Sequence, residues 1–263
     1  MMNKQVKIWL IAAACLIVLG CILWVGVMMN LHWDFTKLST VKMESNSYTV
    51  TQPYQNISIQ ATTADISVLP SEDAQCKVVC NDQSEIKHEV SVDGDTLTFQ
   101  VKDTRKWYQH IGIGFESSKI TVYLPAGEYG ALTISSTTGD ISLEGVSADT
   151  VQVKLSTGDI KLTDIACRSV SVTGTTGDTV LENVVAKEKL SAERNTGDIL
   201  LKDCDGGEIT LKTTTGDVTG TLLTSKSFVA KTSTGDIDIP QNTDGGRCAV
   251  TTTTGDIRLR IQK

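Results

Sequence analysis

The chain has 263 residues, a net charge of −7 and an aromatic content of only 5%. An acidic chain of this kind repels nucleic acid and anionic lipid, which argues against a nucleic-acid-binding protein. The scarcity of aromatic residues and the abundance of Thr, Ser, Val and Ile favour many short strands over a bundle of helices.

The chain begins with a candidate membrane helix. Residues 8–29 form an uncharged apolar run, and about 20 such residues are enough to cross a bilayer core. Lys4 and Lys7 precede the run, and tryptophans lie near both of its ends, as interfacial anchors do. We therefore expect residues 1–7 to be a cytoplasmic leader, the apolar run to be a transmembrane signal-anchor, and the remainder to lie outside the cell membrane.

Two alternatives to a permanent anchor are weaker. The segment Val18-Leu19-Gly20-Cys21 loosely resembles a lipoprotein cleavage box, but apolar residues continue beyond Cys21, where a polar mature start is expected. No small-residue cleavage site follows the apolar run, which also argues against a removed signal peptide.

The next segments predict a tether followed by irregular β structure. Residues 30–52 are polar with little apolar periodicity and are predicted to be a tether, whereas residues 53–136 begin the β region. Within that region, Asp93-Gly94 separates two alternating segments and predicts a hairpin. The segment Ile120–Leu124 predicts a strand that ends at Pro125.

Residues 103–115 interrupt two predicted strands with basic and aromatic side chains. Rigid aromatic residues and Arg on a loop suit the recognition of a protein or a glycan. The alternative is that the loop folds its aromatic residues over the end of the domain as a cap. The candidate recognition residues are Arg105, Lys106, Trp107, Tyr108 and His110.

Residues 137–263 contain seven copies of Thr-Gly-Asp followed by Ile, Val or Thr, with glycines 19 or 20 residues apart. Such a period predicts one unit stacked on itself, and Thr63-Ala64-Asp65-Ile66 resembles a degenerate eighth copy. Each unit holds two alternating segments, so rungs about 4.8 Å apart would make parallel sheets around an aliphatic interior. The predicted fold is an all-β, single-stranded β-solenoid of the parallel β-helix type. In both 20-residue units the extra residue falls in the turn before the second segment.

The repeated residues suit a structural corner. Gly accepts a positive φ, Asp can bond nearby backbone N–H groups, and stacked Thr side chains can pass hydrogen bonds between rungs. The residues of this predicted turn ladder are Gly139, Asp140, Gly158, Asp159, Gly177, Asp178, Gly197, Asp198, Gly216, Asp217, Gly235, Asp236, Gly255 and Asp256.

Three sharper interpretations of the ladder are less favoured. Ca²⁺ would relieve repulsion along a column of Asp, but a calcium β-roll supplies two oxygen-rich turns per site, whereas here each rung supplies one acid. Ranked Thr residues for ice binding fail in the first four rungs. A wall-polysaccharide enzyme needs a cluster that breaks the repeat, and no rung shows one. We therefore expect no catalytic residue, no resident metal and no cofactor.

The last strand and the cysteines carry two further predictions. Arg258, Arg260 and Lys263 alternate with apolar residues, which predicts a charged terminal edge that blocks further stacking. The five cysteines after the apolar run are odd in number and irregular in spacing, so we expect buried small apolar residues rather than a disulfide framework. These five cysteines are Cys76, Cys80, Cys167, Cys204 and Cys248.

Residues 54–263 resemble the bacterial putative-adhesin family with β-strand repeats, which includes LiaG-like envelope proteins. The resemblance rests on Ile120–Pro125, on the following Leu132-Thr133-Ile134 segment, and on the Thr-Gly-Asp ladder. It implies a surface-exposed β-helical domain of the cell envelope, often on one membrane helix, without established catalytic residues. The implied partner is an envelope protein or a cell-wall glycan, with a link to envelope stress in some relatives.

Overall fold

The computed structural model describes residues 4–34, 43–83, 86–103, 118–241 and 244–262. It divides into a helical unit and a β unit, which are described separately. Helix α1 (Lys4–Asn30) contains the predicted apolar run, and the rings of Trp24 and Trp33 meet edge to face at 5.8 Å. By length and composition α1 can cross a membrane, and a signal sequence near the N-terminus would meet the same criterion.

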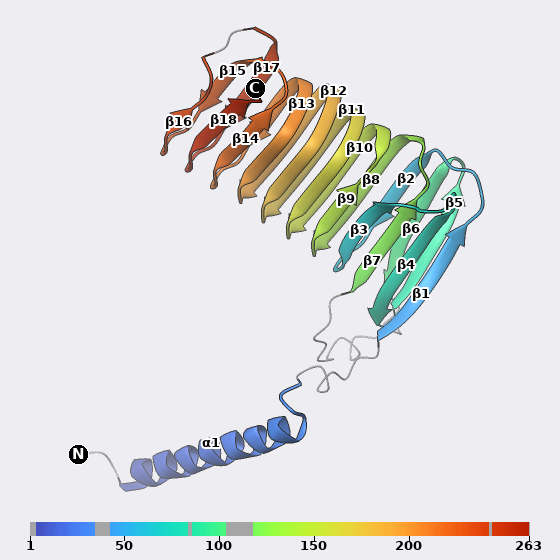
Figure 1. The fold of residues 1–263 in the computed structure, drawn as a ribbon. Coiled ribbons are helices and arrows are strands. Elements are labelled where there is room, and N and C mark those ends of the chain that lie inside the picture. The colour runs from blue at the N-terminus through green and yellow to red at the C-terminus, as the bar shows by residue number, and fades with distance from the viewer. Residues whose placement is uncertain (1–3, 35–42, 84–85, 104–117, 242–243, 263) are drawn as a thin grey trace. The chain divides into compact units, whose positions relative to one another are not determined.

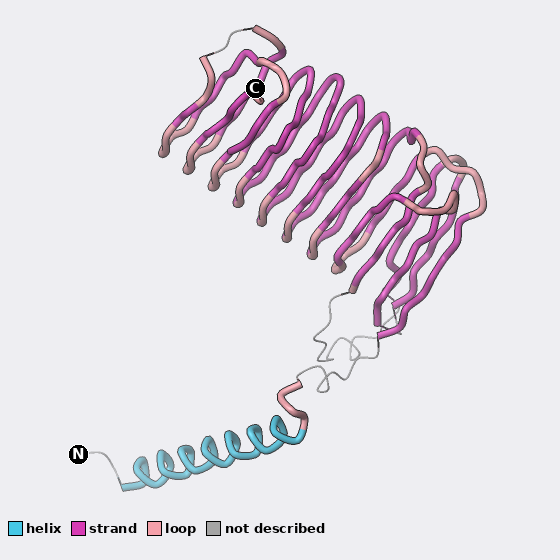
Figure 2. The backbone as a smooth tube through the Cα atoms, viewed as in Figure 1, coloured by secondary structure: helices cyan, strands magenta, loops and turns pink. Residues whose placement is uncertain are grey.

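The β unit is a stack of short strands joined by turns that lie above one another (Figures 1 and 2). Its strands pair into one continuous sheet of 18 strands that winds around the stack. In chain order the strands are β1 (Met43–Val50), β2 (Asn56–Gln60), β3 (Asp65–Pro70), β4 (Cys76–Gln83), β5 (Ile86–Asp93), β6 (Thr96–Asp103), β7 (Lys119–Leu124), β8 (Glu128–Thr138), β9 (Ile141–Glu144), β10 (Ser147–Thr157), β11 (Ile160–Thr176), β12 (Thr179–Thr196), β13 (Ile199–Lys212), β14 (Val218–Leu222), β15 (Lys226–Lys231), β16 (Ile237–Asp238), β17 (Gly246–Thr251) and β18 (Ile257–Ile261).

Each turn of the stack, called a rung below, contributes to two faces. Strands β11, β12 and β13 are long because each crosses the corner between the faces: the first part of β11 pairs with β9 and the second part pairs with β10. All rungs from β8 onward run parallel to their neighbours. β12 carries an extra residue between Ala186 and Lys189, in the turn where the 20-residue spacing predicts it.

Side chains alternate between the interior and the solvent along the stacked strands. In β11, Ile160 and Leu162 are fully buried, whereas Lys161 between them is exposed. Parallel pairing brings equivalent positions of successive rungs together, so the buried aliphatic residues form one continuous core that also contains the five cysteines of the β unit. The predictions of an all-β solenoid and of buried cysteines are confirmed.

The C-terminal end of the stack does not follow chain order. Strand β17 pairs with both β13 and β15, and β18 pairs with both β14 and β16. The C-terminal rung (residues 246–261) is therefore inside the stack, and the edge rung (residues 226–238) is at its end. The prediction that Arg258 and Arg260 mark a charged terminal edge is wrong; Lys263 lies outside the described residues.

A difference in burial and in edge chemistry explains this order. Cys248, Val250, Ile257 and Leu259 of the C-terminal rung are fully buried between two neighbours. The edge rung instead ends in the two-residue strand β16, shortly before Pro240, which has no N–H to donate and therefore suits a sheet edge.

The N-terminal end of the stack shows the same kind of insertion. Strand β2 lies between β6 and β8, and β3 lies between β7 and β9, while β4 and β1 add to β7 in antiparallel order. The predicted hairpin is confirmed as β5–β6, with Gly94 at φ 62°. The predicted tether is too long, because residues 43–50 form β1, whose Tyr48 and Val50 pack against the core.

Candidate functional site

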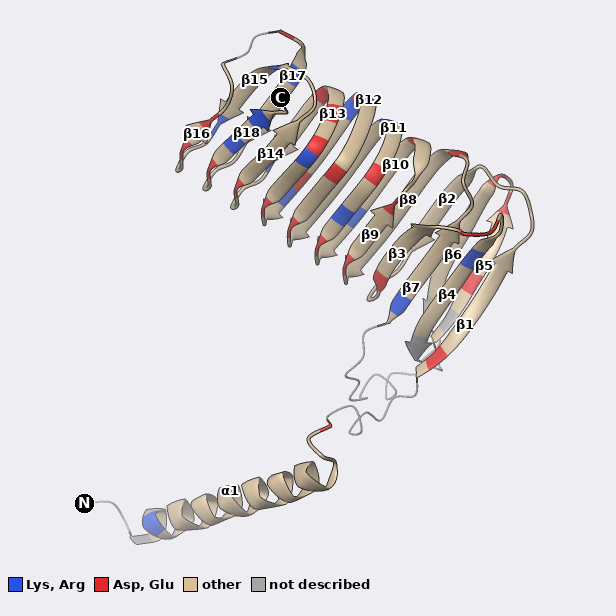
Figure 3. Cartoon of the chain, in the orientation of Figure 1, with Lys and Arg blue, Asp and Glu red and all other residues tan. Residues whose placement is uncertain are grey.

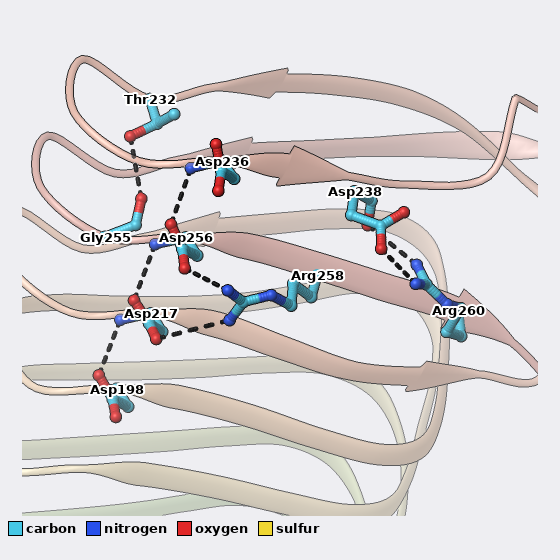
Figure 4. A network of polar contacts seen from close by, with 9 residues as sticks. All are labelled: Asp198, Asp217, Thr232, Asp236, Asp238, Gly255, Asp256, Arg258 and Arg260. Carbon is cyan, nitrogen blue, oxygen red and sulfur yellow. Dashed lines mark hydrogen bonds and ion pairs between the residues drawn. The ribbon is translucent and has the colours of Figure 1, made fainter.

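The aspartates of the repeat form a column of hydrogen bonds along one corner of the stack, called the Asp ladder here. Each carboxylate except the last accepts, through Oδ1, the backbone N–H of the aspartate in the next rung, at 2.7–3.0 Å. Figure 3 shows these acidic residues recurring at successive turns, and Figure 4 shows the last steps of the column. In stacking order the members are Asp65, Asp140, Asp159, Asp178, Asp198, Asp217, Asp256 and Asp236.

The two ends of the Asp ladder differ from its interior. The first step joins Asp65 to Asp140 across 75 residues of sequence, so the degenerate eighth copy is a true rung. At the other end, Asp236 donates its N–H to Asp256, but among the described residues no further rung donates to the Asp236 carboxylate. The backbone N–H of Asp236, followed by Arg258, holds the pKa of Asp256 below its ordinary value.

The ladder glycines have a backbone conformation that other residues adopt only with strain, and they leave no room for a Cβ atom. Gly158 has φ 130°, and a Cβ at this position would lie 2.2 Å from the carbonyl oxygen of Gly139. The other six ladder glycines also have positive φ and face a neighbouring carbonyl in the same way. Backbone bonds close each corner, as where the Gly158 N–H donates to the Thr176 carbonyl at 3.0 Å.

The threonine hydroxyls act differently from the expected rung-to-rung relay. In the part of the chain that the structure describes, threonine hydroxyls that bond to a neighbouring rung at this corner are those of Thr213, Thr232 and Thr252, three residues before a ladder glycine. Each donates to a glycine carbonyl of the neighbouring rung, at 3.0–3.1 Å. Ser136, at the equivalent position, instead donates to the Thr138 carbonyl of its own rung at 3.2 Å. The ladder threonines themselves contribute through the backbone.

The Asp ladder predicts that replacing an interior aspartate lowers the free energy of unfolding more than replacing the terminal one. Asp159→Ala removes the acceptor for the Asp178 N–H, so we expect the free energy of unfolding to fall by about 1 kcal/mol. Asp236→Ala, the matched control, removes a carboxylate that accepts no rung N–H and should leave stability unchanged. Urea unfolding of the full chain in detergent measures both; equal losses would contradict this role of the carboxylates.

The geometry gives no added support to Ca²⁺ along the Asp ladder. One oxygen of each bonded carboxylate is already used by a backbone N–H, and each rung supplies a single acid. Within the described ranges, no group of three or more His, Cys, Asp or Glu side chains could hold a metal ion.

The opposite corner of the stack is built by residues that the sequence reasoning missed. Asp164, Asn183 and Asp203 have φ of 52–55° and Gly145 has φ 65°. All four lie six residues after a ladder glycine, and Gly, Asn and Asp are the residues that best tolerate this left-handed conformation. Asn183 Nδ2 donates to Asp164 Oδ1 at 2.6 Å, which links two neighbouring rungs.

A buried arginine explains where one copy of the motif departs from the pattern. Arg194 is only 2% exposed; its Nε donates to Thr179 Oγ1 and its Nη2 to the Asp178 carbonyl, both at 2.7 Å. The ladder therefore has Thr179 where other rungs have Ile or Val. Gly174 leaves room for the guanidinium, because a Cβ there would lie 2.0 Å from Nη1. Burial lowers the pKa of Arg194, although Asp159 and Asp178 oppose that shift.

A surface groove of about 620 Å³ crosses β8, β10, β11 and β12 at the start of one face. Arg168 lies at its centre: Nε and Nη2 bond the two carboxylate oxygens of Asp149 at 2.7 and 2.8 Å, and Nη1 reaches Glu188 at 3.2 Å. These three side chains come from three successive rungs. The hydrogen bond from Arg168 lowers the pKa of Asp149, and Asp149 in turn raises the pKa of Arg168.

The remaining surface of the groove combines an aromatic wall, an apolar floor and a basic rim. Tyr129 stacks on Tyr54 with the ring centroids 6.1 Å apart, and its hydroxyl donates to the Pro125 carbonyl at 2.7 Å. Burial raises the pKa of Cys167 in the groove to about 11, so this thiol is neutral at physiological pH and is not a nucleophile. Lys187 is exposed at the rim, in the segment between Ala186 and Lys189 where β12 carries its extra residue.

The candidate recognition residues Arg105, Lys106, Trp107, Tyr108 and His110 lie outside the described residues, as does the alternative that their loop caps the domain. The groove was not predicted. Its one signal in the sequence is the column Asp149, Arg168 and Glu188, in which opposite charges alternate at a spacing of one rung.

Comparison with known protein families finds a match for the β unit. A family model described as Toastrack DUF4097 matches residues 54–263. No curated protein matches the chain.

Three solved structures illustrate the likeness. A putative adhesin from Bacteroides fragilis is 16% identical, with a TM-score of 0.48, over 83% of this chain and 97% of that chain. A putative cell adhesion protein from Clostridium sporogenes is 10% identical, with a TM-score of 0.42, over 84% and 100%. A putative lipid binding protein from Parabacteroides distasonis is 13% identical, with a TM-score of 0.40, over 84% and 98%. At such low identity these likenesses carry no inference about a ligand.

Proposed function

The chain belongs to the Toastrack DUF4097 family, and from this membership we propose that it is a membrane-anchored, extracytoplasmic binding module of the bacterial cell envelope. In this proposal, α1 holds the chain in the cell membrane as a single span with its N-terminus inside. The β unit presents a stiff scaffold to an adhesin-type ligand, either an envelope protein or a cell-wall glycan. A sensory accessory role in envelope stress belongs to the same proposal, on the resemblance alone.

The observation that carries the proposal is the groove around Arg168. It is about 620 Å³ in volume, crosses four neighbouring strands, and brings together an aromatic wall, an arginine held in place by two carboxylates, and an exposed lysine. Polar groups fixed in position beside an aromatic ring are suited to recognising hydroxyl and amide groups, which glycans and peptides both offer. The parallel rungs beneath it fix the spacing of these side chains.

The family and the Asp ladder support a scaffold rather than a catalyst. Where the described carboxyl groups have a clearly shifted pKa, the shift is downward, whereas a general acid working at neutral pH needs a raised pKa. The alternative of an enzyme acting on wall polysaccharide therefore gains no support from the described residues.

Photo-cross-linking in living cells tests the proposal. A photoreactive phenylalanine analogue in place of Lys187, in the groove, should give adducts with an envelope protein or a wall glycan. The matched control is the same analogue in place of Lys154, which is exposed on β10 but does not line the groove, and it should give none. Adducts at neither position, or equally at both, would overturn a binding role for the groove.

A further inference from the structure

The solenoid interior is open at the edge rung. Ile237 occupies the core position that is fully buried in other rungs, as in Ile160 and Ile257, yet it is 44% exposed. Val229 on β15 faces outward, because its neighbours Phe228 and Ala230 take the core positions, and it is 54% exposed, more than any other large apolar side chain of the described β unit. Among the described residues of the β unit, the two most exposed large apolar side chains therefore lie in the same rung, and strands β15 and β16 of this rung each pair on one side only.

The hydrogen bonds of the Asp ladder also stop at this edge. Figure 4 shows Asp236 joined to Asp256 through its backbone nitrogen alone, at the last bonded step of the Asp ladder. Lys231 closes β15 just before the same corner, and both charged side chains are exposed. A free strand edge with an uncovered apolar end is a template for pairing with another chain.

The opposite end of the stack does not match this edge. It ends in strands β1, β4 and β5, which run antiparallel to their partners, and it offers no further Gly-Asp corner among the described residues. Head-to-tail stacking into a filament therefore lacks a complementary surface. A contact between two identical edge rungs, related by a two-fold axis, closes on itself instead.

We propose that the edge rung is a self-association surface, and that its occupant is the edge rung of a second copy of this chain. A two-fold axis parallel to the strands sets β15 of each copy antiparallel to β16 of the other. It also brings the two Thr-Gly-Asp corners to the same side, so Lys231 of each copy faces Asp236 of the other. The edge rung is therefore complementary in charge to a second copy of itself. The same contact covers Val229 and Ile237 of both copies. This surface is separate from the groove, so the proposal does not depend on the ligand.

Charge reversal with the full chain in detergent tests the proposal by sedimentation. Lys231→Asp and Asp236→Lys each replace two opposite-charge contacts by like-charge contacts, so we expect each to weaken dimerisation by about tenfold or more. The double variant Lys231→Asp/Asp236→Lys restores the pairing and should recover the wild-type dissociation constant. The Asp236 carboxylate accepts no rung N–H, so the ladder is left intact.

A second pair of variants distinguishes dimerisation through the edge rung from non-specific association through exposed apolar side chains. Ile237→Glu should abolish the dimer, whereas Leu223→Glu, at an apolar residue that is 37% exposed on another rung, should leave it unchanged. A wild-type chain that stays monomeric at all concentrations, or a dimer that Ile237→Glu leaves intact, would overturn the proposal. A photoreactive residue in place of Val229 should yield an adduct of twice the chain mass in cells; an adduct with a different protein instead would assign the edge to another partner and would also overturn it.

Discussion

Replacing Gly158 with alanine is expected to lower the free energy of unfolding by about 3 kcal/mol. Gly158 has φ 130°, which an alanine adopts only with strain, and the added Cβ would lie 2.2 Å from the Gly139 carbonyl oxygen. That oxygen belongs to the backbone of the preceding rung, so it cannot move aside without disturbing the hydrogen bonds of the corner. Urea unfolding of the full chain in detergent, followed by circular dichroism, measures the loss.

Gly127→Ala is the matched control for this prediction. Gly127 does not have a positive φ, and a Cβ there would meet no atom within 4 Å, so the substitution should change stability by less than about 1 kcal/mol. Similar losses for the two variants would contradict the steric role of the ladder glycines.

Replacing Lys226 with methionine is expected to lower the free energy of unfolding by about 2 kcal/mol at neutral pH. Lys226 Nζ lies 2.6 Å from Asp205 Oδ1 and 2.8 Å from the Gly206 carbonyl, with the lysine side chain only 5% exposed. The cost is below that of a fully buried pair because Asp205 is 20% exposed. Lys161→Met, which removes an exposed ion pair with Glu182 at 3.8 Å, is the control and should have little effect.

The same ion pair predicts a dependence on pH. Burial raises the pKa of Asp205, but hydrogen bonds from Lys226, the Gly206 N–H and Thr224 outweigh burial, so the folded pKa lies below its ordinary value. A carboxyl group of this kind contributes stability above its unfolded pKa of about 4 and loses it as the pH falls through the folded pKa. The difference between the wild type and Lys226→Met should therefore shrink below about pH 4. A difference that stays constant down to pH 3 would contradict the assignment.

Lys226 also shows how the order of the rungs is held. It pairs with Gly246 of the C-terminal rung, yet its side chain reaches past that glycine to Asp205 and Gly206 on β13. A Cβ on Gly246 would lie 2.1 Å from the Gly207 carbonyl oxygen. The lysine therefore bridges the two rungs on either side of β17 and encloses the C-terminal rung between them.

The architecture of the repeat could be predicted from the sequence, but the order of its last rungs could not. The regular spacing of Thr-Gly-Asp and the alternation of Ile and Leu specify the corner, the inward faces and the parallel register. The last two rungs carry the same motif, and their aspartates and threonines make equivalent bonds. The C-terminal rung differs in its greater apolar content, and the edge rung differs in Pro240 after β16 and in Lys226 at the start of β15. The partners of Lys226 on β13 become visible only once the order of the rungs is known.

The candidate sites were harder to predict because they depend on contacts between rungs. Asp149, Arg168 and Glu188 occupy equivalent positions of successive rungs, so their column becomes visible only after the register is known. Arg194 is a charged residue at a core-facing position, which sequence reasoning treats as a defect of the pattern. Its partners Thr179 and Gly174 are the compensating changes in two neighbouring units.

The free edge at β15–β16 depends on the C-terminal rung lying inside the stack, and a disulfide test addresses this order directly. Thr219 and Arg258 are neighbours in the pairing of β14 with β18, so Thr219→Cys/Arg258→Cys should form a disulfide within one chain, identified by mass spectrometry of the linked peptides. Thr219→Cys/Asp238→Cys should not, because two rung spacings of about 4.8 Å each exceed the reach of a disulfide. Efficient bonding of the second pair, and none of the first, would show that the rungs stack in chain order.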